Sequence, residues 1–431
     1  MNQAILLKNG NIIYEDGRIE KSKNILIKDG KIEKIFAKNV NENHSKMKYI
    51  VYDCTNKYIT PSFVNLHCHS PMNIFRGIAE DVSINDWFNK KIWPYENNLN
   101  ESDVYLSSVM AFLEMINNGI TTVADHYFFE KSIIDAAISV GMKLDIAPTI
   151  FNENFSNRIK NVESLIKNTK KDTVNISLGP HSPYLLERKK LEEIASMAST
   201  NGLNVHMHIS ETADQVKKSI EKTSTSPFEY LYKLGFFKTK TLVAHGLWIE
   251  KDDLNFINNE TFFAFCPKTY FKLSMGFGNI WKYKNNLNFS FGTDGAASSN
   301  TLNVLEQARI FALTGKILYS AEDFTLTETW KSLMNGHRFF KFNSGKIKEN
   351  FDSDLIIWNL DKINTVPLNN PLASIIYSSD SNNIEAVMLK GNFIKKENKI
   401  VSVENFEEEF KSFLKSKNKI LNTSSMSDRK F

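Results

Sequence analysis

The stretch Ile59-Thr60-Pro61-Ser62-Phe63-Val64-Asn65-Leu66-His67-Cys68-His69 is an apolar run that ends in two histidines separated by one residue. A short apolar run of this kind is typical of a buried strand, and longer stretches with helical spacing follow it. The same alternation recurs, so that we expect eight strands: Ile59 to His67, Ile120 to Tyr127, Lys143 to Ile150, Val174 to His181, Asn204 to Ile209, Thr241 to Trp248, Thr261 to Cys266 and Asn288 to Asp294. This pattern predicts the α/β class and a TIM (β/α)8 barrel, with a doubly wound open sheet as the alternative.

Short strands with turns lie on both sides of these units, in residues 1–58 and 349–400. They are Ala4 to Leu7, Asn24 to Lys28, Lys31 to Phe36, Asp354 to Trp358, Asn383 to Leu389 and Asn392 to Lys396. We therefore expect one small β-sandwich, built from both ends of the chain, beside a barrel formed by residues 59–348.

The last segment, residues 401–431, predicts a helix followed by a frayed tail from Asn422. The helix carries one apolar stripe, which we expect to dock on the body of the protein, formed by Phe406, Phe410, Phe413 and Leu414.

Composition narrows the class of protein. With 431 residues, 42% of them hydrophobic, the chain can form a large core, which excludes disorder as its main state. The formal charge is only +4 and the positive residues are scattered, so no nucleic-acid partner is indicated. No apolar run approaches the roughly 20 residues that cross a bilayer, so no membrane partner is expected.

Three cysteines in a chain of this length do not make a disulfide framework, and they fit a reducing compartment. The N-terminus holds no signal-peptide core. We therefore expect a cytoplasmic protein with a small-molecule partner, and the sequence leaves a homo-oligomer open.

Histidines at the ends of the expected strands are the most informative residues. His67 and His69 are two residues apart, so both can face the same side of a strand, and His208, His245 and Asp294 end three further strands. Imidazole nitrogen and carboxylate oxygen are donors that bind Zn²⁺ and similar divalent ions. Their combination at strand ends predicts a metal site rather than a set of core histidines.

Two details of this site stay open on the residues alone. His206 and His208 form a second His-x-His pair, in which His208 is the favoured ligand because Glu211 follows three residues later. A divalent ion lowers the pKa of a bound water towards about 7, and a carboxylate such as Glu211 can then accept its proton. The alternative for Glu211 is an acid at a helix N-terminus. His245, if it is not a ligand, would orient the water or stabilise developing charge.

Four of these motifs together resemble the amidohydrolase superfamily: Pro61 to His69, His208-Ile209-Ser210-Glu211-Thr212, Ala244-His245, and Gly292 to Ser298. The segment from Met72 to Glu96 is similar to the methylthioadenosine/S-adenosylhomocysteine deaminase branch of that superfamily. The likeness extends over most of the chain.

The resemblance implies roles for individual residues. The metal ligands would be His67, His69, His208 and Asp294, and the catalytic residues Glu211, His245 and Asp294. Glu96 would contact ribose hydroxyls and His181 the purine. Binuclear relatives have a bridging lysine at the end of the fourth strand, where this chain has Leu178-Gly179-Pro180-His181, so we expect one ion, Zn²⁺ or alternatively Fe²⁺.

The chain departs from the branch at positions that concern the substrate. The third strand, which commonly ends near an arginine, offers none here, and Arg158 would either replace it or be solvated. The stretch Cys266 to Tyr270 also differs from the family pattern. Trp93 would line a purine pocket or pack in the core. An uncharged group at the 5′ carbon of the ribose is therefore expected.

The predicted function is hydrolytic deamination of an adenine nucleoside of the methylthioadenosine, adenosine or S-adenosylhomocysteine type, with release of ammonia. The alternatives are a hydrolase or deaminase of another ring, such as guanine, cytosine or a triazine, and a metal-containing barrel without activity. The presence of both Glu211 and His245 favours an enzyme.

Overall fold

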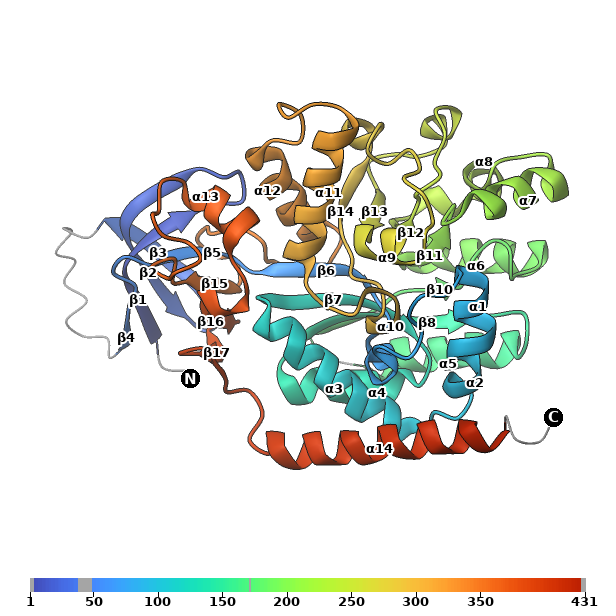
Figure 1. The fold of residues 1–431 in the computed structure, drawn as a ribbon, viewed down its shortest axis with the longest axis horizontal. Coiled ribbons are helices and arrows are strands. Elements are labelled where there is room, and N and C mark those ends of the chain that lie inside the picture. The colour runs from blue at the N-terminus through green and yellow to red at the C-terminus, as the bar shows by residue number, and fades with distance from the viewer. Residues whose placement is uncertain (1–3, 38–48, 170–171, 428–431) are drawn as a thin grey trace.

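Parallel strands surrounded by helices form the centre of the computed structural model, which describes residues 4–37, 49–169 and 172–427 (Figure 1). These strands form two sheets, with the orders β10-β8-β7-β6, to which β9 adds through β8, and β11-β12-β13-β14. Their bounds are β6 (Phe63–Cys68), β7 (Ile120–Tyr127), β8 (Lys143–Ile150), β9 (Val174–Ile176), β10 (Gly179–Pro180), β11 (Val205–Ile209), β12 (Thr241–His245), β13 (Thr261–Phe265) and β14 (Asn288–Phe291). β9 and β10 together correspond to the fourth expected strand, Val174 to His181.

Backbone hydrogen bonds join the two sheets at both seams. At one seam the Leu178 N–H donates to the Asn204 carbonyl at 2.8 Å, and the His206 N–H donates to Leu178 at 2.9 Å. At the other, the N–H groups of Thr293 and Asp294 both donate to the carbonyl of His67 at 3.0 Å. The predicted TIM barrel is therefore confirmed.

The second seam brings the ends of β6 and β14 unusually close together. Asn65 Oδ1 accepts the Thr293 N–H at 3.0 Å, and Asn65 Nδ2 donates to Thr293 Oγ1 at 2.7 Å. A Cβ atom at Gly292 would lie 2.8 Å from the Cβ of His67, a distance that side chains do not adopt. Glycine at this position thus permits the contact that places His67 against the last strand.

Helices cover the outside of the barrel, and side chains fill its interior. Part of the interior is apolar, with Val64, Leu66, Ala124, Leu242, Phe262, Ala264, Phe339 and Phe340 in one cluster. The covering helices are α3 (Glu101–Asn117), α4 (Glu130–Val140), α5 (Phe155–Asn168), α6 (Arg188–Asn201), α7 (Ala213–Thr223), α8 (Pro227–Lys233), α9 (Pro267–Lys272), α10 (Ala296–Ser299), α11 (Val304–Leu318) and α12 (Leu326–Asn335). Short turns between them are η3 (Phe236–Lys238), η4 (Asp252–Asn255), η5 (Lys284–Asn286) and η6 (Gly336–Arg338).

The chain makes a long excursion between β6 and α3, on the rim where the parallel strands end. It contains η1 (Ser70–Phe75), α1 (Ile84–Asp86), η2 (Trp87–Ile92) and α2 (Trp93–Glu96). The start of the excursion is fixed by the buried carboxylate of Asp125 in β7, which accepts hydrogen bonds from the backbone and hydroxyl groups of Ser70.

The small β unit beside the barrel is one nine-stranded sheet that combines both ends of the chain (left of Figure 1). Its strand order is β18-β17-β16-β15-β5-β1-β2-β3, and β4 adds to β1. The bounds are β1 (Ala4–Ile13), β2 (Ile19–Lys28), β3 (Lys31–Ala37), β4 (Tyr49–Asp53), β5 (Tyr58–Pro61), β15 (Leu355–Trp358), β16 (Ile384–Leu389), β17 (Asn392–Lys396) and β18 (Lys399–Ile400). Between β15 and β16 lie α13 (Pro371–Ala373), η7 (Ser374–Ser378) and η8 (Ser381–Asn383).

The first expected barrel strand, residues 59–67, is divided between the two sheets. β5 belongs to the small sheet, where Ile59 pairs with Ile12 and Ile357. At Ser62 the backbone N–H still bonds to Asp354, whereas the next N–H, that of Phe63, bonds to Gly119 in front of β7. Residues 59–61, expected in the barrel, thus lie in the small sheet, because the apolar run continues through both.

The C-terminal helix α14 (Phe406–Ser427) packs along α3, but only Phe413 of the expected stripe packs against the body of the protein (bottom of Figure 1). Phe406, Phe410 and Leu414 are 47%, 42% and 40% exposed. The docked side carries Phe413, as expected, together with Ser416 and Ile420, and the Ser416 hydroxyl donates to Asp103 of α3. The expectation was therefore wrong for Phe406, Phe410 and Leu414, and the docked side is one on which a polar contact to α3 joins the apolar ones.

Residues 422–427, expected in a frayed tail, continue α14 as helical backbone. Extension of an existing helix adds a hydrogen bond for each residue that is fixed, so polar residues can prolong it. The rest of that expected tail, 428–431, lies outside the described residues. In the described part of the chain, no helix combines the length and apolar character that crossing a bilayer requires.

Candidate active site

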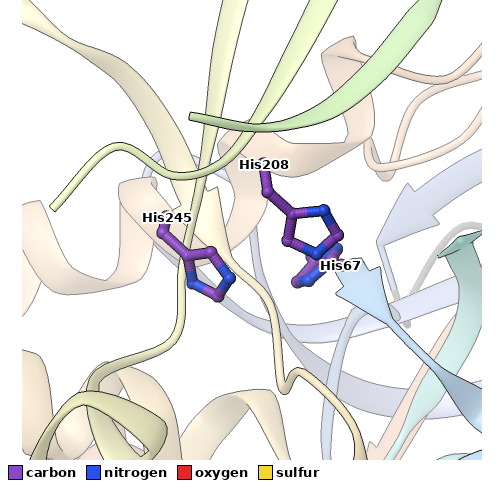
Figure 2. A group of neighbouring side chains, drawn as sticks. All are labelled: His67, His208 and His245. Carbon is purple, nitrogen blue, oxygen red and sulfur yellow. The ribbon is translucent and has the colours of Figure 1, made fainter. Parts of the chain in front are cut away.

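Histidines and one aspartate from four strand ends converge at the rim of the barrel. His67 lies in β6, His208 in β11 and His245 at the end of β12, and their imidazole rings face one another (Figure 2). His69 and Asp294 follow β6 and β14. One donor atom each from His67, His208 and His245 lies within 4.8 Å of the others, and the same holds for His67, His69 and Asp294.

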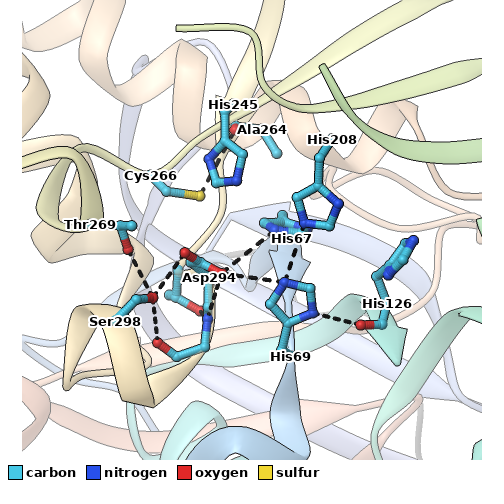
Figure 3. A network of polar contacts seen from close by, with 12 residues as sticks. His67, His69, His126, His208, His245, Ala264, Cys266, Thr269, Asp294 and Ser298 are labelled. Carbon is cyan, nitrogen blue, oxygen red and sulfur yellow. Dashed lines mark hydrogen bonds and ion pairs between the residues drawn. The ribbon is translucent and has the colours of Figure 1, made fainter. Parts of the chain in front are cut away.

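Four donor atoms point to the middle of this cluster. Three are Nε2 atoms of histidines, and the fourth is a carboxylate oxygen. His69 Nε2 lies 3.3 Å from His208 Nε2 and 3.4 Å from Asp294 Oδ1, and His67 Nε2 lies 3.7 Å from the same oxygen (Figure 3). Three imidazole nitrogens and a carboxylate oxygen make a donor set that suits Zn²⁺ and related divalent ions.

The opposite nitrogen of each ring fixes which atom is free to bind. His69 Nδ1 donates to the carbonyl of His126 at 2.6 Å, and His208 Nδ1 donates to the carbonyl of His181 at 2.9 Å. A carbonyl can only accept, so in both rings Nδ1 carries the proton and Nε2 keeps its lone pair. His67 Nδ1 pairs with His206 Nε2 at 2.8 Å, and His67 Nε2 is buried without a partner among the described residues. This arrangement fits a metal ion.

Burial also sets the charge of these rings. It is the main cause that lowers the pKa of His67 and of His208 well below 6.5, and the neighbouring imidazoles lower it further. Burial likewise lowers the pKa of His181 and of His206 to about 3. His67 and His208 are therefore neutral near pH 7, as imidazole donors to a cation must be.

Two members of the site have an unusual backbone conformation. His245 and Asp294 have φ angles of 72° and 57°, in the left-handed region that residues other than glycine seldom adopt. The Asp294 carboxylate is then held by the N–H of Gly295 and the hydroxyl of Ser298, both at 2.8 Å (Figure 3). Strained turns after β12 and β14 thus aim both side chains at the centre.

Glu211 lies beside the cluster at the start of α7. Its Oε1 is 3.6 Å from His245 Nε2, and its carboxylate is buried. Gln215 contacts Glu211 twice: its Oε1 accepts the Glu211 N–H at 3.1 Å, and its Nε2 lies 3.4 Å from Glu211 Oε2. A carboxylate in this position can exchange a proton with a group held by the cluster.

A cavity of about 360 Å³ opens above the cluster, which is a suitable volume for a small-molecule ligand. Glu96, His181 and Trp93, which we expected at the substrate, all line it together with Glu211 and His245. Trp93 is 47% exposed. Further lining residues from the excursion, from the second to fourth strands and from α7 include Trp87, Phe88, Tyr127, Phe128, Phe151, Leu185 and Lys218.

Arg158 does not line this cavity. Its guanidinium forms an ion pair with Glu130, and its Nε donates to the carbonyl of Thr149 at 2.9 Å. Phe151, which follows β8, lines the cavity and stacks on His181 with 5.0 Å between the ring centroids. An aromatic ring therefore occupies the end of the third strand, where the sequence analysis looked for an arginine.

Three residues that support the site were not predicted from the sequence. Tyr127, the last residue of β7, donates a hydrogen bond of 2.6 Å to Glu96 Oε1. Tyr270 is buried and packs edge-on against His245, and its hydroxyl accepts the N–H of Cys266, which gives the divergent Cys266–Tyr270 stretch a place behind His245. The third is Gln215. The position of Tyr127 at a strand end was a signal in the sequence.

Comparison with known proteins is consistent with this geometry. The model of the amidohydrolase family matches residues 58–394. A 5-methylthioadenosine/S-adenosylhomocysteine deaminase of Pyrococcus horikoshii is 32% identical over 425 residues, covering 93% of this chain and 97% of its own. A 5′-deoxyadenosine deaminase of Methanococcus vannielii is 33% identical over 373 residues, covering 84% of this chain and 88% of its own.

Solved structures show the same fold. An adenosine deaminase from Xanthomonas campestris with bound zinc superposes with a TM-score of 0.91 at 20% identity, over 97% of this chain and 98% of that one. An atrazine chlorohydrolase from Arthrobacter aurescens, complexed with zinc, has a TM-score of 0.87 at 20% identity, over 96% of this chain and all of that one. With a family model that covers most of its length and relatives above 30% identity, the chain belongs to the amidohydrolase family.

Proposed function

We propose that this protein is a metal-dependent deaminase that hydrolyses the exocyclic amino group of adenine nucleosides and releases ammonia. The observation that carries the proposal is a single cavity that combines three elements: the histidine cluster, the Glu211 carboxylate, and the Glu96 carboxylate. The names of the relatives from Pyrococcus and Methanococcus support an adenine nucleoside as the substrate.

One Zn²⁺ ion is proposed at the cluster, with His67, His69, His208 and Asp294 as its ligands. The buried Nε2 of His67, which has no hydrogen-bond partner among the described residues, and the lowered pKa values of His67 and His208 support this assignment. When bound, such an ion supplies Lewis acidity, which makes a water molecule nucleophilic at neutral pH.

Glu211 is proposed to move the proton. Its carboxylate accepts a proton from the attacking water and then delivers it to the departing amino nitrogen, so that ammonia leaves as a neutral molecule. His245, 3.6 Å from Glu211, orients the water and stabilises charge that develops during the addition. The buried carboxylate of Asp294, which lies 3.4 Å from His69 Nε2, orients the same water.

The rest of the cavity is proposed to bind the nucleoside. Glu96 accepts hydrogen bonds from the ribose hydroxyls, His181 contacts the purine, and Trp93 covers the exposed side. Arg158 is engaged with Glu130, and Phe151 stands where a cation would bind a carboxylate. An uncharged 5′ group, as in 5′-deoxyadenosine, methylthioadenosine or adenosine, is therefore preferred to the charged amino-acid group of S-adenosylhomocysteine.

Ammonia release by the purified, zinc-loaded protein tests this function. We expect turnover of methylthioadenosine and adenosine with a kcat/KM at least equal to that for S-adenosylhomocysteine, and much lower values for free adenine and guanine. Elemental analysis should give one equivalent of zinc for each chain. Turnover of a free base or a triazine without any nucleoside activity would refute the proposal, and two equivalents of metal that survive dialysis would refute the single-ion site.

A further inference from the structure

Tyr127 and Glu96 form a pair that joins two separate parts of the chain at the cavity wall. Tyr127 is the last residue of barrel strand β7, and Glu96 is the last residue of α2, in the excursion between β6 and α3. The Tyr127 hydroxyl donates to Glu96 Oε1 at 2.6 Å, and the tyrosine is only 2% exposed. Both residues line the cavity.

The tyrosine is the fixed member of this pair. Its ring stacks on Phe128, with centroids 4.2 Å apart, and lies 6.3 Å from the ring of His69. Burial raises the pKa of Tyr127 well above 10, so the hydroxyl keeps its proton and can donate. The position of the donated hydrogen is therefore set by the barrel, which also holds the histidine cluster.

Glu96, in contrast, is carried by a helix of a single turn. Its carboxylate makes one side-chain hydrogen bond among the described residues, the bond from Tyr127. A carboxylate offers about four lone-pair directions, so one bond to Oε1 leaves Oε2 and one direction of Oε1 open to the cavity. Those two oxygens can accept two adjacent hydroxyl groups only if the plane of the carboxylate is held.

We infer that Tyr127 is a positioning residue that orients the Glu96 carboxylate to accept both hydroxyls of a ribose diol. This inference deepens the proposed function and rests on it. According to this inference, the pair of Tyr127 and Glu96, and not Glu96 alone, distinguishes ribonucleosides from nucleosides that lack the 2′ and 3′ hydroxyl groups. The pair also ties the excursion to the barrel, so that the diol and the reacting ring are held at a fixed separation.

The test compares Tyr127→Phe with the wild type on adenosine and on 2′,3′-dideoxyadenosine. The variant removes one hydroxyl group and keeps the ring that contacts Phe128 and His69. A hydrogen bond to a charged group is lost, so we expect kcat/KM for adenosine to fall about tenfold, mainly through KM. For the dideoxy compound, which cannot use the oriented carboxylate, the change should stay within about twofold.

Tyr95→Phe is the matched control. Tyr95 precedes Glu96 on the same short helix, and its ring packs near Phe75, with 6.4 Å between centroids. The control removes the same chemical group beside Glu96 without removing the bond to its carboxylate, so it should keep the wild-type preference for adenosine. Glu96→Gln should lower the same preference, and the combination with Tyr127→Phe should lower it no further. Zinc content and Tm are measured for every variant.

The outcomes separate the inference from the proposed function. An equal loss on both substrates, or a loss of zinc in Tyr127→Phe, would mean a structural role and overturn the inference. A wild-type preference in Tyr127→Phe, with the preference lost in Glu96→Gln, would overturn the inference and leave the proposed function intact. If the wild-type protein deaminates no nucleoside, the proposed function itself fails.

Discussion

A buried imidazole nitrogen with no partner is unfavourable, because a polar group has left water and gained nothing in return. His67 Nε2 is such an atom, and the Nδ1 bonds of His69, His208 and His67 each direct an Nε2 towards the same place. Binding of a cation compensates this cost, so the affinity for metal depends on the carbonyl groups of His126 and His181 as well as on the ligands.

Glu211→Gln is the sharpest change of a single residue at this site. The amide has nearly the same shape and leaves all four proposed ligands in place, so the protein should keep its metal. It cannot accept a proton from water, and kcat should fall by about 10²–10⁴. Steady-state kinetics and elemental analysis on the same preparation check both expectations. A near-normal kcat with full metal content would assign the proton transfer to another residue.

At the scale of the element, the start of α7 serves the helix and the site together. Thr212 Oγ1 accepts the N–H of Gln215 at 3.2 Å, and Gln215 Oε1 accepts the N–H groups of Glu211 and Thr212. This reciprocal capping box satisfies N–H groups that a helix leaves unpaired. The same glutamine reaches the Glu211 carboxylate, so the cap also positions the proposed proton shuttle.

Thr212→Ala and Gln215→Ala separate these two roles. Each removes half of the capping box and should destabilise the protein by about 1 kcal/mol. Only Gln215→Ala removes the contact to the carboxylate, and we expect it to lower kcat by about three- to tenfold, while Thr212→Ala keeps kcat close to wild type. Thermal unfolding and kcat are measured on both variants. Equal kcat values would show that the glutamine acts on the helix alone.

The barrel strands could be predicted because parallel strands are buried on both faces and read as apolar runs. β7 and β8 begin and end at the residues expected for them. For the run from Ile59 to His67, the expectation of one continuous barrel strand was wrong. Apolar residues do not show which sheet a strand joins, and the change of sheet at Ser62 depends on hydrogen bonds to Asp354 and Gly119.

The supporting residues could not be predicted in the same way. Tyr127 and Glu96 are 31 residues apart and meet only because the excursion folds back onto β7. In α14, the hydrophobic stripe suggested one docked face, whereas the bond from Ser416 to Asp103 selects another. Such contacts depend on how two elements are placed relative to each other. The hydrophobic periodicity within one helix or strand does not predict this placement.

At the scale of the whole molecule, a buried ion pair joins the barrel to the small sheet. Lys143 begins β8, at the end of the barrel opposite the histidine cluster, and is fully buried. Its Nζ donates to Asp352 Oδ2 at 2.8 Å and to Asp354 Oδ2 at 2.5 Å. Asp354 directly precedes β15 and is 1% exposed, and its other oxygen accepts the Lys390 N–H at 3.0 Å. One cation thus connects both halves of the fold.

Lys143→Met should therefore destabilise the protein by about 3–5 kcal/mol, because it leaves buried carboxylates without their counter-charge. Burial already raises the pKa of Asp354, and loss of the lysine raises this pKa further. A carboxyl group whose pKa is higher in the folded state than in the unfolded state makes stability fall as pH rises. The gap in Tm between variant and wild type should accordingly be wider at pH 8 than at pH 5, while kcat at 25 °C stays near wild type. In Lys143→Met/Asp354→Asn the neutral amide should recover part of the stability and reduce the pH dependence of Tm. If the Tm of Lys143→Met equals that of the wild type at pH 8, the ion pair does not hold the two sheets together.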